Sequence, residues 1–151
     1  VNSYIALGVK EGATIVQGGN PIEISQHGFY IEPTLFVDGH SSMRINQEEI
    51  FGPVACAIAV DDYDEAMKTA NDVEYGLSAG IVTNSHAIVG DFQRNAQAGM
   101  IMVNRSTAST DFHVPFGGTK DSSFGPREQG QLAQDFFTSM STIYTAGGGA
   151  W

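Results

Sequence analysis

The sequence predicts an α/β fold built around a parallel sheet. Three apolar runs, at residues 54–60, 77–83 and 100–103, have the length and the bounding turn residues of buried strands. The two stretches between them carry apolar side chains at helical spacing, which predicts a strand–helix–strand–helix–strand order. Such a βαβαβ unit implies parallel strands joined by right-handed crossovers.

The elements before this unit are shorter. Residues 1–11 predict the end of a helix that stops at Gly12, and residues 14–19 predict a strand that runs into a Gly-Asn-Pro turn. Residues 29–38 are extended, but Pro33 argues against one long central strand there. Because the chain opens inside a helical pattern and not with Met, we expect that it does not begin where its gene product begins.

The two crossover helices have clear start and stop signals. An Asp cap and further acidic residues open the first helix, at residues 61–72. Ser85 can cap the second, at residues 86–98, and Gly99 stops it. Ligands of open α/β sheets bind outside the carboxyl ends of the strands. Those ends fall here at residues 61–62, 83–84 and 104–105.

The last part of the chain is less regular. Residues 104–125 are loop-like, and residues 126–140 predict a helix with Pro126 near its first turn. We expect Arg127 and Glu128 to be a structural pair at the start of this helix. Residues 141–145 alternate in polarity and predict an edge strand without a partner in this chain.

Composition excludes several classes of protein. The 17 Asp and Glu residues against 7 Lys and Arg give a net charge of −10, which disfavours binding to nucleic acid. No apolar run approaches the ~20 residues that span a bilayer, so we expect no membrane insertion. The single cysteine cannot form an internal disulfide, which fits a reducing compartment, and we expect a cytoplasmic protein.

Common short motifs for metals and nucleotides are missing. The sequence has no GxGxxG fingerprint, Walker loop, HExxH or CxxC motif. The histidines lack metal-ligand spacing, so we expect no metal site; they stand at positions 27, 40, 86 and 113.

Glu48, Glu49 and Cys56 have side chains that could act as a base or a nucleophile. Glu48 and Glu49 precede Ile-Phe-Gly-Pro, but neighbours in an extended segment point to opposite sides, which disfavours a hydrolase pair. We expect Glu48 to be structural or exposed. Cys56 lies in an apolar run without a cationic neighbour that would lower its pKa, so we expect no nucleophile there.

Four motifs in fixed order are far more specific. They are EEIFGPV (48–54), YGLSAGIVT (75–83), AGMIMVN (98–104) and PFGGTKDSSFGPREQG (115–130). Together they resemble the C-terminal part of the aldehyde dehydrogenase superfamily, and the resemblance covers essentially residues 1–145. It implies oxidation of aldehydes to carboxylic acids with NAD or NADP and a cysteine nucleophile.

The resemblance also implies roles for single residues. The second glutamate of the first motif, Glu49, would bind the nicotinamide ribose hydroxyls, and Phe51 would pack near the nicotinamide. Phe116 of the Pro-Phe-Gly-Gly motif would line the aldehyde tunnel. We expect Gly117 and Gly118 of the same motif to serve backbone geometry and not phosphate binding.

The motif at 113–130 is especially similar to that of bacterial enzymes acting on 2-oxoglutarate semialdehyde. Arg105, Ser106 and Thr107 could hold the carboxylate of such a substrate, since arginine presents a fork of donors and the hydroxyls add more.

The family's nucleophile, its base and its Rossmann half lie upstream of these motifs. The resemblance therefore predicts an α/β catalytic-domain fragment at 1–136, an oligomerisation strand at 137–146 and a flexible tail at 147–151. It predicts no catalytic residue in this chain, a homo-oligomer, and no turnover by the chain alone. The alternative is a standalone interaction module that has kept the fold without the chemistry.

Overall fold

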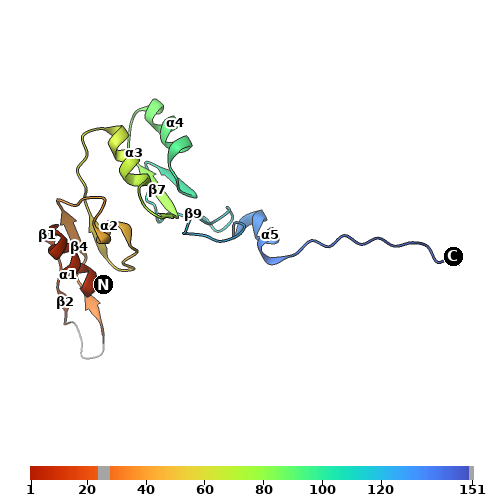
Figure 1. The fold of residues 1–151 in the computed structure, drawn as a ribbon, viewed down its shortest axis with the longest axis horizontal. Coiled ribbons are helices and arrows are strands. Elements are labelled where there is room, and N and C mark those ends of the chain that lie inside the picture. Colours follow the sequence, from red (N-terminus) through yellow and green to blue (C-terminus); the bar gives the residue numbers. More distant parts are fainter. Residues whose placement is uncertain (24–27, 150–151) are drawn as a thin grey trace. The chain divides into compact units, whose positions relative to one another are not determined.

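The computed structural model describes residues 1–23 and 28–149, which form two compact units (Figure 1). The first unit is Val1–Glu74 and the second is Tyr75–Trp151.

A three-stranded sheet organises the first unit. Strand β4 (Thr34–Val37) is central, with β1 (Thr14–Gln17) antiparallel on one side and β5 (Val54–Cys56) parallel on the other. Helices α1 (Asn2–Glu11) and α2 (Arg44–Gln47) supply the remaining core side chains. Buried side chains form one cluster around Phe36, which is 0% exposed; the others are Ile5, Ala13 and Ile45.

The predicted first helix is confirmed, and its end has a specific geometry. Gly12 adopts the left-handed region at φ 104°, and its N–H bonds back to the carbonyls of Gly8 and Val9. A Cβ on Gly8 would lie 2.9 Å from the Phe36 ring. The small residue therefore lets α1 approach the sheet closely.

Two short strands and a capped helix complete this unit. β2 (Pro21–Ile22) pairs antiparallel with β3 (Tyr30–Ile31). Pro33 separates β3 from β4, as its place in the extended stretch predicts. α3 (Tyr63–Asn71) is the predicted first crossover helix, and the Asp62 carboxylate caps it by accepting from the Glu65 N–H at 2.9 Å.

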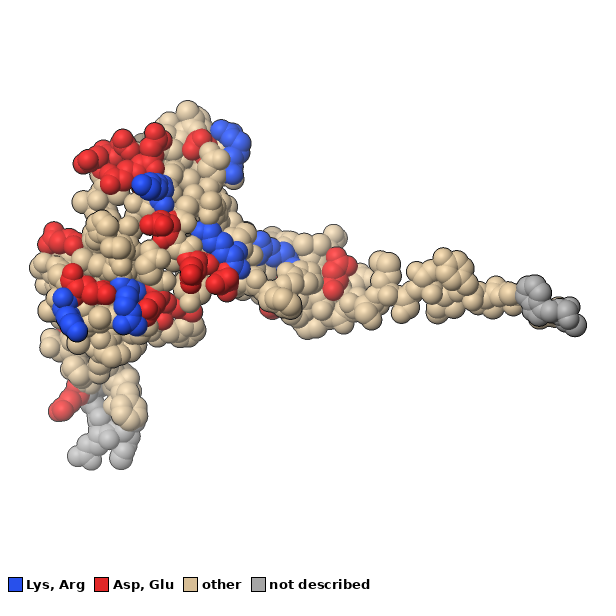
Figure 2. Space-filling view, viewed as in Figure 1, with Lys and Arg blue, Asp and Glu red and all other residues tan. Residues whose placement is uncertain are grey.

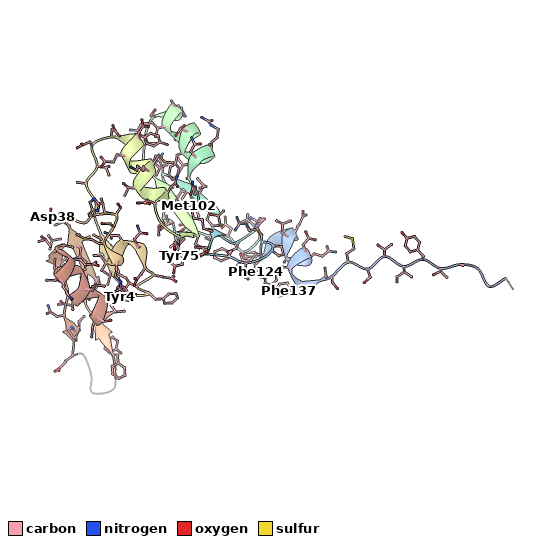
Figure 3. The ribbon with its side chains drawn as sticks, in the orientation of Figure 1. Tyr4, Asp38, Tyr75, Met102, Phe124 and Phe137 are labelled. Carbon is pink, nitrogen blue, oxygen red and sulfur yellow. The ribbon has the colours of Figure 1, made fainter. Side chains whose placement is uncertain are left out.

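The second unit contains a βαβ crossover. β7 (Ser78–Ile81) and β8 (Met100–Val103) pair in parallel, and α4 (His86–Asn95) connects them. Ser85 caps α4 by accepting from the Ile88 N–H, as predicted. The predicted stop at Gly99 is wrong, because α4 ends at Asn95 and Ala96 is already extended. The buried apolar side chains of the second unit are Phe92 and Met102, of which Figure 3 labels Met102.

The first predicted strand of the βαβαβ unit needs correction. β5 pairs in parallel with β4 in the first unit and not with β7. Of the pairings predicted for the βαβαβ unit, only the parallel one between β7 and β8 is therefore confirmed. β5 also ends at Cys56, and residues 57–60 form no strand. Ala55 and Val60 are exposed, so this apolar run is not buried on both faces as expected.

The C-terminal segment differs most from expectation. The helix predicted at 126–140 shortens to the 3₁₀ turn Gly130–Leu132 and α5 (Ala133–Phe137), because Gln129 and Gly130 both have positive φ. The strand predicted at 141–145 is not formed. An edge strand needs a neighbour for its backbone hydrogen bonds, and this segment has none in the described part of the chain.

Among the described residues no helix is both long and apolar enough to cross a bilayer.

Candidate functional site

The segment that follows α2 exposes its side chains selectively. Glu48 and Ile50 are partly buried, and Ile50 packs against the core cluster. Glu49 and Phe51, which alternate with them, are exposed. Gly52 lies against α1, since a Cβ there would be 2.4 Å from a Val1 methyl group. The segment is therefore held on its helix side and presents Glu49 and Phe51 outward.

Glu48 is bound by two helices. The Tyr4 hydroxyl on α1 donates to Oε2 at 2.6 Å (Figure 3 shows Tyr4). Arg44 on α2 donates from Nε to Oε1 at 2.6 Å and from Nη2 to Oε2 at 2.9 Å. The Arg44 hydrogen bonds, followed by that of Tyr4, hold the pKa of Glu48 below its usual range, and Glu48 raises the pKa of Arg44. The expected structural role of Glu48 is thus what the geometry shows.

Glu49 has a different environment. Its carboxylate is exposed and makes no hydrogen bond or ion pair with any residue that the structure describes. A carboxylate offers two oxygens and can accept from two hydroxyl groups at once. Glu49 therefore fits the donor set of a ribose.

Phe51 has an unusual backbone. Its φ of 54° is in the left-handed region, which bulky side chains rarely adopt, and the residue is 88% exposed. Residues held in such conformations concentrate at binding sites, where the surroundings over-determine them. The exposed ring fits a place against a flat apolar ligand surface.

The carboxyl ends of β7 and β8 meet at Asn104, which the sequence places at a strand end without indicating its hydrogen bonds. Asn104 accepts from the Thr83 N–H at 2.9 Å through Oδ1 and donates to the Thr83 carbonyl at 3.1 Å through Nδ2. Its own N–H bonds to the Ile81 carbonyl at 2.8 Å, and its φ is 54°. An Asn directly after a strand is the available signal, because Asn tolerates this backbone region and bonds locally.

The loop after Asn104 carries three residues that are predicted to bind the substrate. Arg105, Ser106 and Thr107 are all exposed. They stand at a turn, in which Ser106 Oγ accepts from the Ala108 N–H at 3.3 Å. The Thr107 methyl group lies over Gly80, where a Cβ would be 3.0 Å away.

The Pro-Phe-Gly-Gly motif is anchored mainly by its backbone. Phe116 is partly buried and exchanges two backbone hydrogen bonds with Glu128, of 2.7 and 3.0 Å. Gly117 and Gly118 are buried, and a Cβ on Gly99 would lie 2.0 Å from the Gly117 carbonyl oxygen. A Cβ on Gly117 would lie 2.8 Å from Arg127 Nη1 and one on Gly118 2.6 Å from Ser122 Cβ, so both glycines allow close packing.

Arg127 and Glu128 do not form the helix-terminal pair that we expected. Arg127 Nη1 donates to the Gly118 carbonyl, and Glu128 bonds through its backbone to Phe116. The pairing arises because the positive-φ residues Gln129 and Gly130 turn the chain before any helix starts.

The remaining candidate residues are Cys56 and the histidines. Cys56 is partly buried, and its thiol lies near the Ala57 carbonyl at 3.9 Å. Within residues 1–23 and 28–149 no three His, Cys, Asp or Glu side chains gather in a way that could hold a metal ion. His27 lies outside the described residues.

Comparison with known proteins gives the family. The model of the aldehyde dehydrogenase family matches residues 1–143. The chain belongs to the aldehyde dehydrogenase family. It is 47% identical over 144 residues to an alpha-ketoglutarate semialdehyde dehydrogenase of Haloferax volcanii and 44% identical over 144 residues to one of Bacillus subtilis. These alignments cover 93% and 94% of this chain but only 30% of each relative, so the chain spans about a third of their length.

Solved structures of the family agree. The indole-3-acetaldehyde dehydrogenase of P. syringae, in complex with NAD+ and IAA, superimposes with a TM-score of 0.86 at 40% identity, over 91% of this chain and 28% of that one. An aldehyde dehydrogenase of Mycobacterium tuberculosis, complexed with NAD+, gives a TM-score of 0.84 at 36% identity, over 96% of this chain and 30% of that one. The chain therefore has the fold of a segment of an aldehyde dehydrogenase, as its motifs predict.

Proposed function

We propose that this chain is the C-terminal segment of an NAD(P)-dependent aldehyde dehydrogenase that oxidises an aldehyde to a carboxylic acid. The observation that carries the proposal is the exposed carboxylate of Glu49, which has no partner among the described residues, close to the left-handed, exposed Phe51. Both stand in the motif through which the family resemblance assigns cofactor contacts. The relatives that bind NAD+ support a dinucleotide as the ligand.

The role of these two residues would be to bind and orient. Glu49 would accept hydrogen bonds from the two hydroxyls of the nicotinamide ribose. Phe51 would lie against the nicotinamide, limit water there and fix the ring for transfer. The bound NAD or NADP supplies the acceptor for the hydride that leaves the aldehyde.

The second unit would select the aldehyde. Phe116 would line the approach to the reacting carbon, and Arg105, Ser106 and Thr107 would bind a substrate carboxylate. 2-Oxoglutarate semialdehyde is the proposed substrate, supported by the two semialdehyde dehydrogenases among the relatives.

The domain assignment forms part of the same proposal. Residues 1–136 would be the C-terminal portion of the catalytic domain, residues 137–146 an oligomerisation segment and residues 147–151 a tail, of which 150–151 lie outside the described residues. No catalytic residue is assigned in the chain, and a cytoplasmic homo-oligomer stays a prediction.

A chimera tests the proposal. Residues 1–145 would replace the matching segment of the Bacillus subtilis relative, with the unaltered relative as the control. We expect NAD(P)+-dependent oxidation of 2-oxoglutarate semialdehyde by the chimera, weaker cofactor binding in Glu49→Gln, and no turnover by the 151-residue chain alone. A folded chimera without activity would contradict the proposal, and aldehyde oxidation by the isolated chain would contradict its non-catalytic part.

One observation favours the second candidate, an interaction module. The C-terminal segment exposes large apolar side chains, Met140 at 98% and Tyr144 at 92%, besides Phe137 and Ile143 (Figure 3 shows Phe137). Residues 138–149 contain no charged side chain (Figure 2). Light scattering of the chain and of a 1–136 truncation tests it: self-association lost on truncation supports the module, and a monomeric full chain contradicts it.

A further inference from the structure

We propose that Tyr4 and Arg44 are positioning residues, which decide through Glu48 that Glu49 is the carboxylate presented to the cofactor. The inference rests on the proposed function of Glu49 and adds residues that the motif itself does not include. The observation behind it is that Glu48 and Glu49 are chemically identical neighbours with opposite environments.

Local sequence gives only part of the reason for this difference: Arg44 stands four residues before Glu48, the spacing of an ion pair on a helix, but Tyr4 is 44 residues away. Either glutamate could face outward, because a register shift of one residue in an extended segment exchanges the sides of neighbouring residues. The structure shows three hydrogen bonds on Glu48 and none on the carboxylate of Glu49 within the described part of the chain. The donors to Glu48 come from α1 and α2, so the choice depends on these helices.

The charges favour the same arrangement. Two adjacent carboxylates repel each other, and the Arg44 guanidinium compensates the charge of Glu48 in a two-pronged ion pair. Glu49 then carries the uncompensated charge on the outward side. A ligand with hydroxyl donors therefore meets only the carboxylate of Glu49, in a defined position.

The hydrogen bonds that hold Glu48 also affect the backbone of Phe51. Its left-handed backbone persists only if the flanking residues hold it. Glu48 is held by Tyr4 and Arg44 on one side of it, and Gly52 is held against Val1 on the other. Loosening Glu48 therefore frees one end of the short segment that carries both Glu49 and Phe51.

Backbone 15N relaxation of the 151-residue chain gives the first test and needs no cofactor. We expect lower order parameters at Glu49–Phe51 in Arg44→Met and Tyr4→Phe, with those of β4 and β5 unchanged. Lys10→Met, an exposed residue of α1, removes one positive charge in the same unit and is the matched control. Lower order parameters throughout the first unit, or no change beyond that of the control, would overturn the inference.

NAD+ affinity in the chimera gives the second test, measured by titration in the absence of aldehyde. We expect Arg44→Met and Tyr4→Phe to raise the Kd by about three- to tenfold, with Arg44→Lys intermediate because it keeps the charge without the fork. Lys10→Met should leave the Kd unchanged.

Glu49→Gln distinguishes a failure of the positioning inference from a failure of the proposed cofactor site. If it weakens NAD+ binding while Arg44→Met and Tyr4→Phe behave like Lys10→Met, the positioning inference fails and the proposed function stands. If Glu49→Gln leaves NAD+ binding unchanged, the proposed cofactor site fails, and the positioning inference fails with it.

Discussion

The hydroxyl of Tyr4 donates a 2.6 Å hydrogen bond to Oε2 of Glu48, a residue 44 positions further along the chain. The bond joins the first helix of the chain to the start of the motif that we assign to cofactor binding. Its acceptor is also the partner of Arg44, so one carboxylate connects two helices and the segment between α2 and β5. This connection has consequences for pH dependence.

The pKa of Glu48 predicts how stability changes in acid. Because hydrogen bonds from Arg44 and Tyr4 lower this pKa in the folded chain, the stabilisation is present above the unfolded-state pKa. It is lost as the pH falls from about 4 through the lowered value. We expect the melting temperature of Glu48→Gln to be less pH-dependent than that of the wild type in this window. Thermal melts at several pH values measure it, and parallel curves for the two proteins would contradict the assignment.

Substitution of Gly99 should destabilise the second unit. A Cβ at this position would lie 2.0 Å from the Gly117 carbonyl oxygen and 2.7 Å from Gly118 Cα, and both contacts are with backbone. We expect Gly99→Ala to cost about 1–3 kcal/mol in urea denaturation. Gly147→Ala is the control, since no atom lies within 4 Å of a Cβ there. Equal stability of the two variants would contradict the close packing described for the Pro-Phe-Gly-Gly motif.

Asn104 can be tested with two substitutions that separate its roles. Asn104→Gly keeps access to positive φ and loses the two hydrogen bonds to Thr83, whereas Asn104→Ala loses both features. We expect a loss of about 1–3 kcal/mol in Asn104→Ala and a smaller loss in Asn104→Gly. Chemical denaturation followed by circular dichroism measures both, and the opposite order would show that backbone strain is not part of the cost.

Phe36 should be the most sensitive position of the first unit. Its side chain is fully buried and contacts α1 at Gly8. Phe36→Ala should destabilise the chain by about 3–5 kcal/mol, because it removes a large apolar side chain and leaves a cavity. Leu35→Ala, on the same strand but 39% exposed, should cost much less in the same denaturation experiment. Similar losses for the two would contradict the core described here.

Local signals in the sequence were sufficient for three helix ends, although Gly99 does not stop α4 as predicted. Gly12, Asp62 and Ser85 each stand where a helix ends or begins in the structure. Such signals depend on a few neighbouring residues, so they can be read without knowledge of the fold. The parallel pairing of β7 with β8 followed from the same kind of evidence, because a helix of this length between two apolar runs favours a crossover.

Pairings between distant segments could not be predicted in this way. The run at 54–60 has the composition of a buried strand, yet β5 pairs with β4 and stops at Cys56. Burial depends on what covers a strand, and neighbouring residues do not contain that information. The strand predicted at 141–145 failed for a related reason, since its hydrogen-bonding partner is not in the described chain.

The sequence by itself determined the family, through four motifs in fixed order, and it named Glu49, Phe51 and the loop at 105–107 as the residues to examine. Only the tertiary structure brought Tyr4 to Glu48 and left Glu49 exposed, whereas Arg44 stands four residues before Glu48 and pairs with it locally. It also revealed Asn104 as the clamp between two strand ends. The physical reason is the same in both cases. A carboxylate or an amide acquires its role from partners that folding brings to it, and Tyr4 and Thr83 stand far in sequence from Glu48 and Asn104.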